Sequence, residues 1–181
     1  MPIEVELKFK IKDLQELEYE LIEKSAKLDR IVNQKDYYFS HPCRDFSKSD
    51  EALRIREDGS RNFLTYKGKK IDSKTKTRLE IETVINNTQE MINILSKLGF
   101  TIIAIVAKDR RIYNLQNIFF CLDNVESLGS FLEVEEVVDN IKKVQDTKKK
   151  IYQLLQNLNI NTKESIRDSY LELLLKKKEK G

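Results

Sequence analysis

Residues 3–9 read Ile-Glu-Val-Glu-Leu-Lys-Phe, an unbroken alternation of apolar and charged side chains. Successive side chains of a β-strand point to opposite faces, so this alternation predicts a strand. Glu4, Glu6 and Lys8 would share one face of that strand, and the apolar residues would share the other. An ordinary surface strand would show the same pattern, so the interpretation depends on the rest of the chain.

Six further segments alternate in the same way. They are residues 52–56, 63–67, 78–82, 105–113, 119–123 and 131–135. Their polar faces are nearly all ionisable and carry both signs of charge across the set. The polar face of an ordinary antiparallel sheet is instead a mixture that includes Ser, Thr, Gln and Asn. The predicted sheet therefore has a face of unusual composition.

Two architectures are compatible with these strands. In the first, the aliphatic faces form the core of an ordinary sheet protein and the charges meet water as solubilising pairs. In the second, about eight antiparallel strands close into a barrel, the charges line its lumen and helices cover the outside. Because buried charges are costly, such a lumen would have to hold water, metal ions and a highly charged ligand. Acids and bases side by side point to polyphosphate with divalent cations.

The charged residues suit that ligand chemically. Mg²⁺ and Mn²⁺ prefer carboxylate and phosphate oxygens, while Arg can bind two phosphate oxygens at once and Lys acts as a point charge. The acids that could supply carboxylates are Glu4, Glu6, Glu80, Glu82, Asp123, Glu133 and Glu135. The bases that could bind phosphate are Lys8, Arg54, Arg56, Lys67, Arg78 and Lys108. Phosphoryl chemistry needs little beyond positioning, charge neutralisation and a metal.

The order of these residues resembles the signature of the CYTH family, the triphosphate tunnel metalloenzymes, which includes class IV adenylyl cyclases, thiamine triphosphatases and inorganic triphosphatases. The motifs are Glu4-x-Glu6-x-Lys8, Arg54-x-Arg56, Lys67, Arg78-x-Glu80-x-Glu82, Lys108-x-Arg110, Asp123 and Glu133-x-Glu135. They lie within positions 3–136. Two more segments resemble the cyclase-like branch: Gln34-x-Asp36-x-Tyr38-Phe39 and Ser169-Tyr170-Leu171-Glu172-Leu173-Leu174.

The resemblance implies an α+β fold, a closed eight-stranded antiparallel β-barrel that forms a triphosphate tunnel with a charged lumen and helices packed on the outside. One CYTH domain would span residues 1–181, with the barrel core at about 2–137 and C-terminal helices at about 142–178. The implied cofactor is Mg²⁺ or Mn²⁺. Its leading ligands would be Glu4, Glu6, Glu133 and Glu135, with Glu80, Glu82 and Asp123 behind them. The triphosphate-binding set would be Lys8, Arg54, Arg56, Lys67, Arg78, Lys108 and Arg110, and the catalytic set Glu4, Glu6 and Lys8.

Three functions follow as expectations. In a class IV cyclase, the 3′-hydroxyl of ATP attacks the α-phosphorus and pyrophosphate leaves, giving cyclic AMP. In a triphosphatase, water attacks the terminal phosphorus of inorganic, thiamine or nucleoside triphosphate. The third reading is a catalytically silent polyphosphate- or nucleotide-binding module. The two cyclase-like segments favour the first, although no residue pattern defines an adenine pocket.

Helices are expected between and after the strands. Apolar periodicity predicts them at 14–22 behind an Asp13 cap, at 88–98 before Gly99, at 151–158 and at 166–175. Polar composition predicts loops at 41–50, 59–62 and 68–76. These helices would cover the outside of the barrel.

Composition excludes several other classes. The net charge of +3, on a chain with 35% charged residues, indicates a balanced surface and no nucleic-acid partner. The sequence has no apolar run long enough to span a membrane and no N-terminal apolar signal segment. Cys43 and Cys121 are expected to be free thiols in a reducing cytoplasm. The expected partner is a small-molecule triphosphate, ATP or tripolyphosphate, and the resemblance to cyclases suggests a homodimer.

Overall fold

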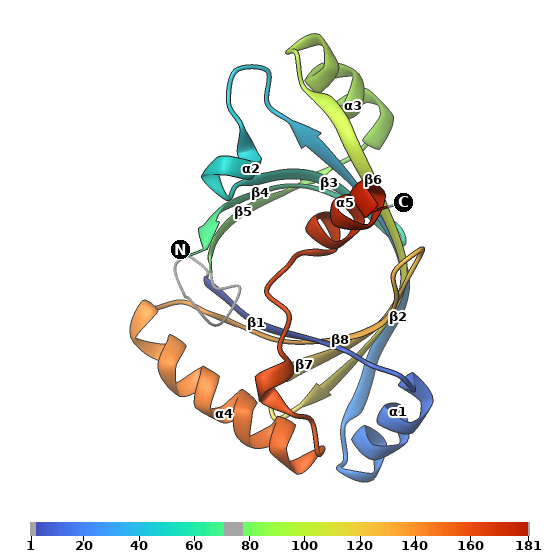
Figure 1. Cartoon of the computed structure of the whole chain (residues 1–181), viewed down its shortest axis with the longest axis vertical. Helices are drawn as coiled ribbons and strands as arrows, with labels where there is room; N and C mark the ends of the chain where they lie inside the picture. The colour runs from blue at the N-terminus through green and yellow to red at the C-terminus, as the bar shows by residue number, and fades with distance from the viewer. Residues whose placement is uncertain (1–2, 71–77, 181) are drawn as a thin grey trace.

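Eight strands close into an antiparallel barrel in the computed structural model, which describes residues 3–70 and 78–180 (Figure 1). The strands are β1 (Ile3–Lys10), β2 (Lys27–Ser40), β3 (Ala52–Asp58), β4 (Arg61–Lys70), β5 (Arg78–Ile85), β6 (Thr101–Leu115), β7 (Ile118–Val125) and β8 (Gly129–Val138). Their order around the barrel is β1-β5-β4-β3-β2-β6-β7-β8. The predicted closed barrel is therefore confirmed, and the ordinary sheet with water-facing charges is excluded.

Strand β2 is absent from the seven strands that the alternation predicts. Its pairing with β6 shifts register between Leu28 and Arg30, where a β-bulge interrupts the alternation. Its first half is also largely exposed to solvent, so no apolar face marks it. This strand nevertheless closes the barrel, because it bridges β3 and β6.

The barrel is joined least firmly between β1 and β5. Among the described residues, only Ile3 and Glu4 of β1 pair with β5, whereas β1 pairs with β8 from Ile3 to Lys10. Further along, the free edge of β1 meets the C-terminal part of the chain: the backbone N–H of Ile166 donates to the carbonyl oxygen of Lys8 at 2.7 Å. The C-terminal segment thus completes this seam.

Two hairpins turn within two residues. Gly59, with φ 61°, and Ser60 connect β3 to β4, so the loop predicted at 59–62 is shorter, and Arg61 already belongs to β4. Gln116 and Asn117, with φ 54° and 64°, connect β6 to β7. Positive φ at the turn matches the right-handed twist of the flanking strands.

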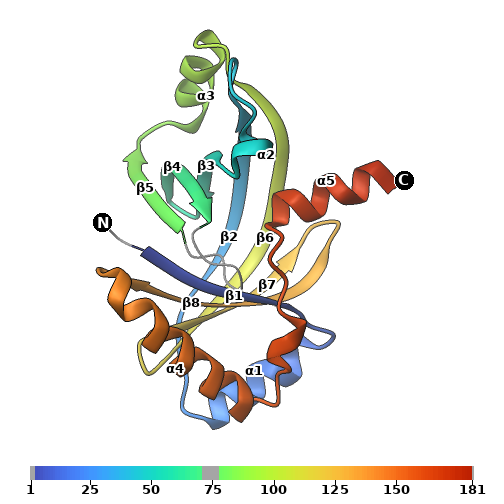
Figure 2. The same ribbon diagram turned by 60° about the vertical axis from the view of Figure 1, so that its left-hand side comes forward.

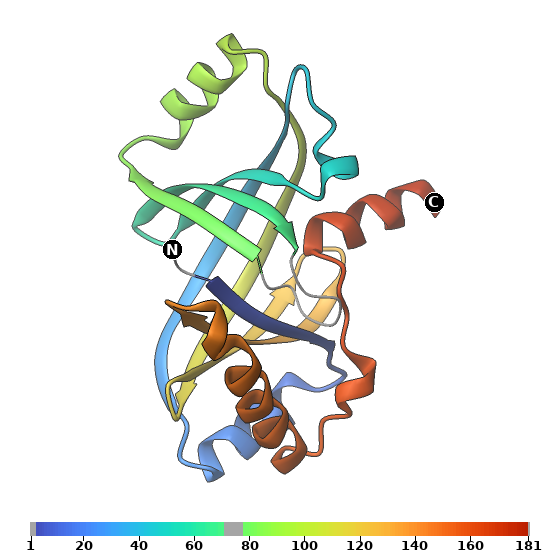
Figure 3. The same cartoon turned by 90° about the vertical axis from the view of Figure 1, so that its left-hand side faces the viewer.

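The helices cover two sides of the barrel and one of its ends. They are α1 (Leu14–Glu23), the short α2 (Phe46–Ser49), α3 (Thr88–Lys97), α4 (Val144–Asn157) and α5 (Tyr170–Lys180), with 3₁₀ turns η1 (Ile141–Lys143) and η2 (Thr162–Glu164). Helices α1 and α4 lie together on one side of the barrel, at the bottom of Figure 3, and α3 lies on the opposite side, at the top. Helix α5 projects from the end of the barrel (Figure 2). None of the helices in the described part of the chain is long and apolar enough to cross a membrane.

The outer core explains this arrangement. Val5, Leu7 and Phe9, the apolar face of β1, are buried with Leu17 and Leu21 of α1 and with the apolar face of α4. Beneath α3, Ile55 and Phe39 pack against Leu95. Apolar side chains therefore face outward to the helices, which leaves the charged face of each strand for the lumen.

The helix boundaries differ from several predictions. Asp13 does cap α1, accepting from the backbone N–H groups of Gln15 and Glu16 at 2.8 and 3.1 Å. Helix α4 begins before the predicted 151, at Val144, and α5 begins after the predicted 166, at Tyr170. Residues 166–169 lie outside any helix, and the backbone N–H of Ile166 donates to β1. The predicted loop at 41–50 contains α2, and that at 68–76 overlaps β4 as far as residue 70, with the rest outside the described residues.

Candidate functional site

Alternate residues of the strands point into a cavity of about 510 Å³ inside the barrel. The predicted site residues that line it are Glu4, Glu6, Lys8, Arg54, Arg56, Lys67, Arg78, Glu80, Glu82, Lys108, Arg110, Glu133 and Glu135. Asp123 is the exception, since it is fully buried behind the lining. The structure thus brings the predicted lining residues together from six of the strands. Strand β2 adds Asp36.

Three carboxylates converge at one side of the cavity. Glu6 of β1 lies directly opposite Glu135 of β8 in the strand register, and Glu4 is one step along the same face. One oxygen of each lies within 4.8 Å of the others. Burial raises the pKa of Glu135 to about 7, with the Glu4 charge adding to the effect. We call Glu4, Glu6 and Glu135 the acid trio. Its crowded oxygen donors fit Mg²⁺ or Mn²⁺, which would relieve their mutual repulsion.

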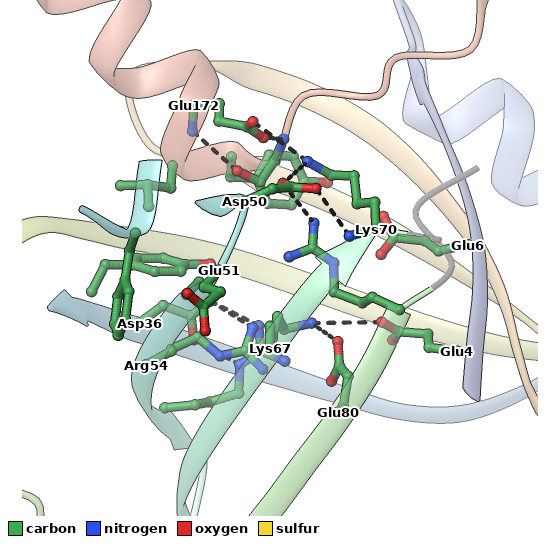
Figure 4. Close-up of a pocket in the computed structure, with 18 of the residues that line it drawn as sticks. Glu4, Glu6, Asp36, Asp50, Glu51, Arg54, Lys67, Lys70, Glu80 and Glu172 are labelled. Atoms are coloured by element: carbon green, nitrogen blue, oxygen red, sulfur yellow. Dashed lines mark hydrogen bonds and ion pairs between the residues drawn. The ribbon is translucent and has the colours of Figure 1, made fainter. Parts of the chain in front are cut away.

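Lys67 lies beside the acid trio, between Glu4 and Glu80 (Figure 4). Its Nζ is 3.5 Å from a carboxylate oxygen of Glu4 and forms an ion pair with Glu80. Burial raises the pKa of Glu4, and Lys67 offsets only part of that rise. Burial acts on Glu80 in the same direction, but Lys67, the hydrogen bond with Glu4 and the Arg54 charge together outweigh it, and the pKa of Glu80 is lowered. The lysine thus helps to keep Glu80 charged.

The acids Asp123 and Glu133 hold cations of the cavity wall. Arg110 donates to both oxygens of Asp123, at 2.6 and 2.5 Å, and also contacts Glu133. Lys8 lies 3.0 Å from Glu133, and Lys108 lies 3.3 Å from Asp123. Burial and the nearby Arg110 charge lower the pKa of Lys108. Both acids lie outside the acid trio and contact cations of the wall, and their role as metal ligands stays a prediction.

The two arginines of β3 share one acid. Asp36 receives a two-pronged contact from Arg56 and lies 3.5 Å from Arg54. Burial alone would raise the pKa of Asp36, but the two arginines outweigh it and lower that pKa far below its ordinary value. The Nε of Arg54 is buried and has no hydrogen-bond acceptor within the described residues. Such an orphaned cationic donor is suited to an anionic ligand oxygen.

The mouth of the cavity is bound together by a second charge network (Figure 4). Lys70 at the end of β4 contacts Asp50 at 2.7 Å and Glu172 of α5 at 3.5 Å. Arg78 at the start of β5 lies 3.9 Å from Asp50. Arg78 therefore lies at the mouth, whereas Glu82 lies elsewhere on the lining, is exposed to solvent and accepts a hydrogen bond from Thr65 at 2.8 Å.

The model of the CYTH domain matches residues 2–170 of this chain. The chain belongs to the CYTH family. A Methanocaldococcus jannaschii protein that is provisionally named an adenylate cyclase is 42% identical over 171 residues, which cover 94% of this chain and 98% of that protein.

Solved structures share the CYTH fold. A protein of Pyrococcus horikoshii OT3 superposes with a TM-score of 0.88 at 40% identity, covering 96% of this chain and 99% of that one. A Hippeastrum protein, provisionally named an adenylyl cyclase and described as having a dominant triphosphatase activity, superposes with a TM-score of 0.64 at 18% identity. That match covers 88% of this chain and 89% of the other.

Sequence reasoning missed several residues of this CYTH site. Asp36 gave one signal, its place in the segment Gln34–Phe39 that resembles the cyclase-like branch, but β2 was not predicted. Glu172 gave the same kind of signal, because it lies in the segment Ser169–Leu174 that also resembles that branch. Asp50 and Lys70 gave none, because no alternating pattern connects the segments that their contacts join. The predicted residues were found because each lies on a strand with regular alternation.

Proposed function

We propose that this CYTH protein is a divalent-metal-dependent enzyme acting on triphosphates, and specifically an adenylyl cyclase that converts ATP to cyclic AMP and pyrophosphate. The observation that carries the proposal is that a cluster of carboxylates and a pair of arginines line one cavity. The acid trio occupies β1 and β8, and the arginines Arg54 and Arg56 lie on β3, three strands away around the barrel. Carboxylates for a metal and cations for phosphate thus share one enclosure.

The acid trio would hold Mg²⁺ or Mn²⁺ by its carboxylate oxygens. When bound, the ion supplies Lewis-acid stabilisation of charge that develops on the phosphate oxygens. Glu80 is a further candidate ligand, because Lys67 pairs with both Glu4 and Glu80 and so brings the two carboxylates near each other.

The cationic residues would bind and orient the triphosphate. Arg54 has the orphaned Nε, and Lys67 and Lys108 add point charges from two other strands. In the proposed reaction the 3′-hydroxyl oxygen attacks the α-phosphorus, the bond between the α-phosphorus and the pyrophosphate oxygen breaks, and the hydroxyl proton leaves to the pyrophosphate or to water. The protein contributes by fixing this geometry, by neutralising the leaving group and by excluding water.

The mouth of the cavity supports a nucleoside triphosphate over an inorganic one. Phe46, Ile103 and Leu175 line it alongside the polar Ser47 and Glu51. An apolar rim with a few polar groups suits a planar organic group attached to the triphosphate. Inorganic triphosphate has no apolar group that could contact this rim. The provisional name of the Methanocaldococcus jannaschii relative points the same way.

Hydrolysis is the alternative, since the same carboxylates and cations would serve water attack on the terminal phosphorus. The test is a product assay on the purified protein, offered ATP and tripolyphosphate in parallel with Mg²⁺, with Mn²⁺ and with a chelator. Cyclic AMP with pyrophosphate, formed only with metal, is the expected result. Orthophosphate release would show that the protein is a triphosphatase and overturn the cyclase proposal. If the protein bound both compounds and formed no product, the non-catalytic binding module would be the remaining interpretation.

A further inference from the structure

Tyr170 carries an aromatic ring from the C-terminal segment into the charged cavity. It is the first residue of α5, it lines the cavity, and only 4% of its surface is exposed. Its hydroxyl donates to Asp123 at 2.8 Å, and its ring meets Phe131 edge to face at a centroid distance of 5.1 Å. Burial and the nearby Glu133 and Asp123 charges raise the pKa of Tyr170 well above its ordinary value, so the hydroxyl keeps its proton.

The ring also lies against two lysines of the cavity wall. The Nζ of Lys8 is 3.5 Å from the ring centroid, and the Nζ of Lys108 is 4.9 Å from it. Both distances are within the range of cation–π attraction. These lysines come from β1 and β6, which are not neighbours in the barrel. The ring therefore attracts two ammonium groups that repel each other.

The C-terminal segment holds Lys8 in two additional ways. The N–H of Ile166 donates to the backbone carbonyl of Lys8, and the Nζ of Lys8 donates to the carbonyl oxygen of Asp168 at 3.2 Å. Ser169 and Glu172 exchange hydrogen bonds at 2.5 and 3.1 Å, which fixes the start of α5. The position of the ring is thus set by backbone contacts on both sides of it.

We propose that Tyr170 is a positioning residue, which holds the ammonium groups of Lys8 and Lys108 ready for the phosphate oxygens of the substrate. The proposal rests on the proposed triphosphate chemistry. Glu133 and Asp123 offset part of the charge of these lysines, whereas the aromatic face attracts an ammonium group without cancelling its charge. The hydroxyl shares an oxygen of Asp123 with Lys108, so it weakens the attraction of that carboxylate for the ammonium group.

The test compares two substitutions of Tyr170 in the full chain. Tyr170→Phe keeps the ring and loses the bond to Asp123, while Tyr170→Leu loses both. Because cation–π contacts of desolvated lysines are substantial, we expect Tyr170→Leu to raise KM and Kd for the triphosphate about tenfold, with kcat within about threefold of wild type. Tyr170→Phe should raise KM less, by about threefold. Tyr170→Met is a second ring-less variant in case leucine prevents folding, because Met fills irregular spaces.

The matched control is Tyr113→Phe. Tyr113 is equally buried and also donates its hydroxyl to a carboxylate, that of Glu18, but it lies in the outer core under α1. This variant should lose thermal stability and keep the wild-type KM. A merely structural Tyr170 would behave in the same way, with a lower Tm and an unchanged KM.

Calorimetry with tripolyphosphate and with ATP, in the presence of Mg²⁺, distinguishes a failure of the role proposed for Tyr170 from a failure of the proposed function. Wild-type protein that binds either compound, together with a ring-less variant of unchanged Kd, would overturn the role of Tyr170 and leave the proposed function intact. Wild-type protein that neither binds nor converts either compound would overturn both.

Discussion

Asp36 fixes Arg56 through two hydrogen bonds, from Nε to one carboxylate oxygen at 2.6 Å and from Nη2 to the other at 2.7 Å. The same carboxylate lies 3.5 Å from Arg54. A single acid of β2 therefore balances and orients both arginines of β3. Paired contacts of this kind define the plane of a guanidinium group, and so the direction in which its remaining donors point.

We expect Asp36→Asn to destabilise the protein and make it more responsive to its ligand. The amide keeps the shape but leaves two buried arginines without their counter-charge, which should lower the free energy of unfolding by about 3 kcal/mol. Tripolyphosphate would supply the missing negative charge, so it should stabilise the variant more than the wild type. Urea unfolding with and without tripolyphosphate measures both effects.

The control for this variant is Asp58→Asn. Asp58 is also buried, but it pairs with Arg30 at 3.2 Å and Gln34 at 3.1 Å and does not line the cavity. The Asp58→Asn variant should be less stable than the wild type, but tripolyphosphate should stabilise it no more than it stabilises the wild type. Equal ligand responses in the two variants would refute the balancing role of Asp36.

Glu6→Gln should abolish metal-dependent turnover while leaving the metal-free fold intact. The substitution removes one of three crowded carboxylates, so metal affinity and activity should fall by ~100-fold or more, whereas the relief of repulsion should keep or raise the metal-free Tm. Activity titrated against Mn²⁺, with thermal unfolding in chelator, provides the measurement.

Glu136→Gln provides the comparison for Glu6→Gln. Glu136 adjoins Glu135 in sequence but contacts Lys150 of α4 at 3.8 Å. The Glu136→Gln variant should keep the turnover and the metal dependence of the wild type. Near-normal activity of Glu6→Gln at saturating metal would remove Glu6 from the metal site.

Regular alternation made most of the barrel and its lining predictable. In β1, Val5 and Leu7 must face the helices, so Glu4 and Glu6 must face the lumen, and the strand period alone decides this. The same reasoning placed Arg54 and Arg56. What remained hidden was the identity of each partner, because strand period gives a face but no neighbour across a closed barrel.

The unpredicted part of the site comes from irregular segments. The bulge near Leu28 obscured β2, and with it the role of Asp36. Tyr170 lies in a C-terminal amphipathic stretch whose apolar periodicity predicts only packing on the outside of the barrel. The irregular residues before α5 lead it into the cavity, and they contact β1 through the hydrogen bond from Ile166 to Lys8. Local sequence carries no information about such a contact.

Lys67→Met should make the acid side of the cavity more dependent on metal. Lys67 pairs with Glu4 and Glu80, so its removal leaves two partly buried carboxylates without a cation. We expect a lower Tm in chelator and a larger rise of Tm on addition of Mn²⁺ than in the wild type. Differential scanning fluorimetry across a Mn²⁺ series gives both quantities.

Lys70→Met tests whether that response is specific to Lys67. Lys70 pairs with Asp50 and Glu172 at the mouth, away from the acid trio. Its loss should lower Tm with no added response to Mn²⁺. The account of Lys67 would be wrong if both variants, or neither, showed the larger Mn²⁺ effect.

The raised pKa of Glu135 predicts how the metal-free protein responds to pH. Its pKa is about 7 in the folded protein and 4.5 as an ordinary glutamate, so the folded state holds this proton more tightly than the unfolded state does. The resulting stabilisation is fully present below pH 4.5 and is lost as the pH rises to about 7. Because other groups also titrate, the measurement is the difference in Tm, in chelator, between wild type and Glu135→Gln across that range. The wild type should lose stability relative to the variant as the pH rises, and saturating Mn²⁺ should oppose that loss by favouring the ionised carboxylate. A difference in Tm that stays constant with pH would show that Glu135 is ionised throughout and that burial and Glu4 do not govern it.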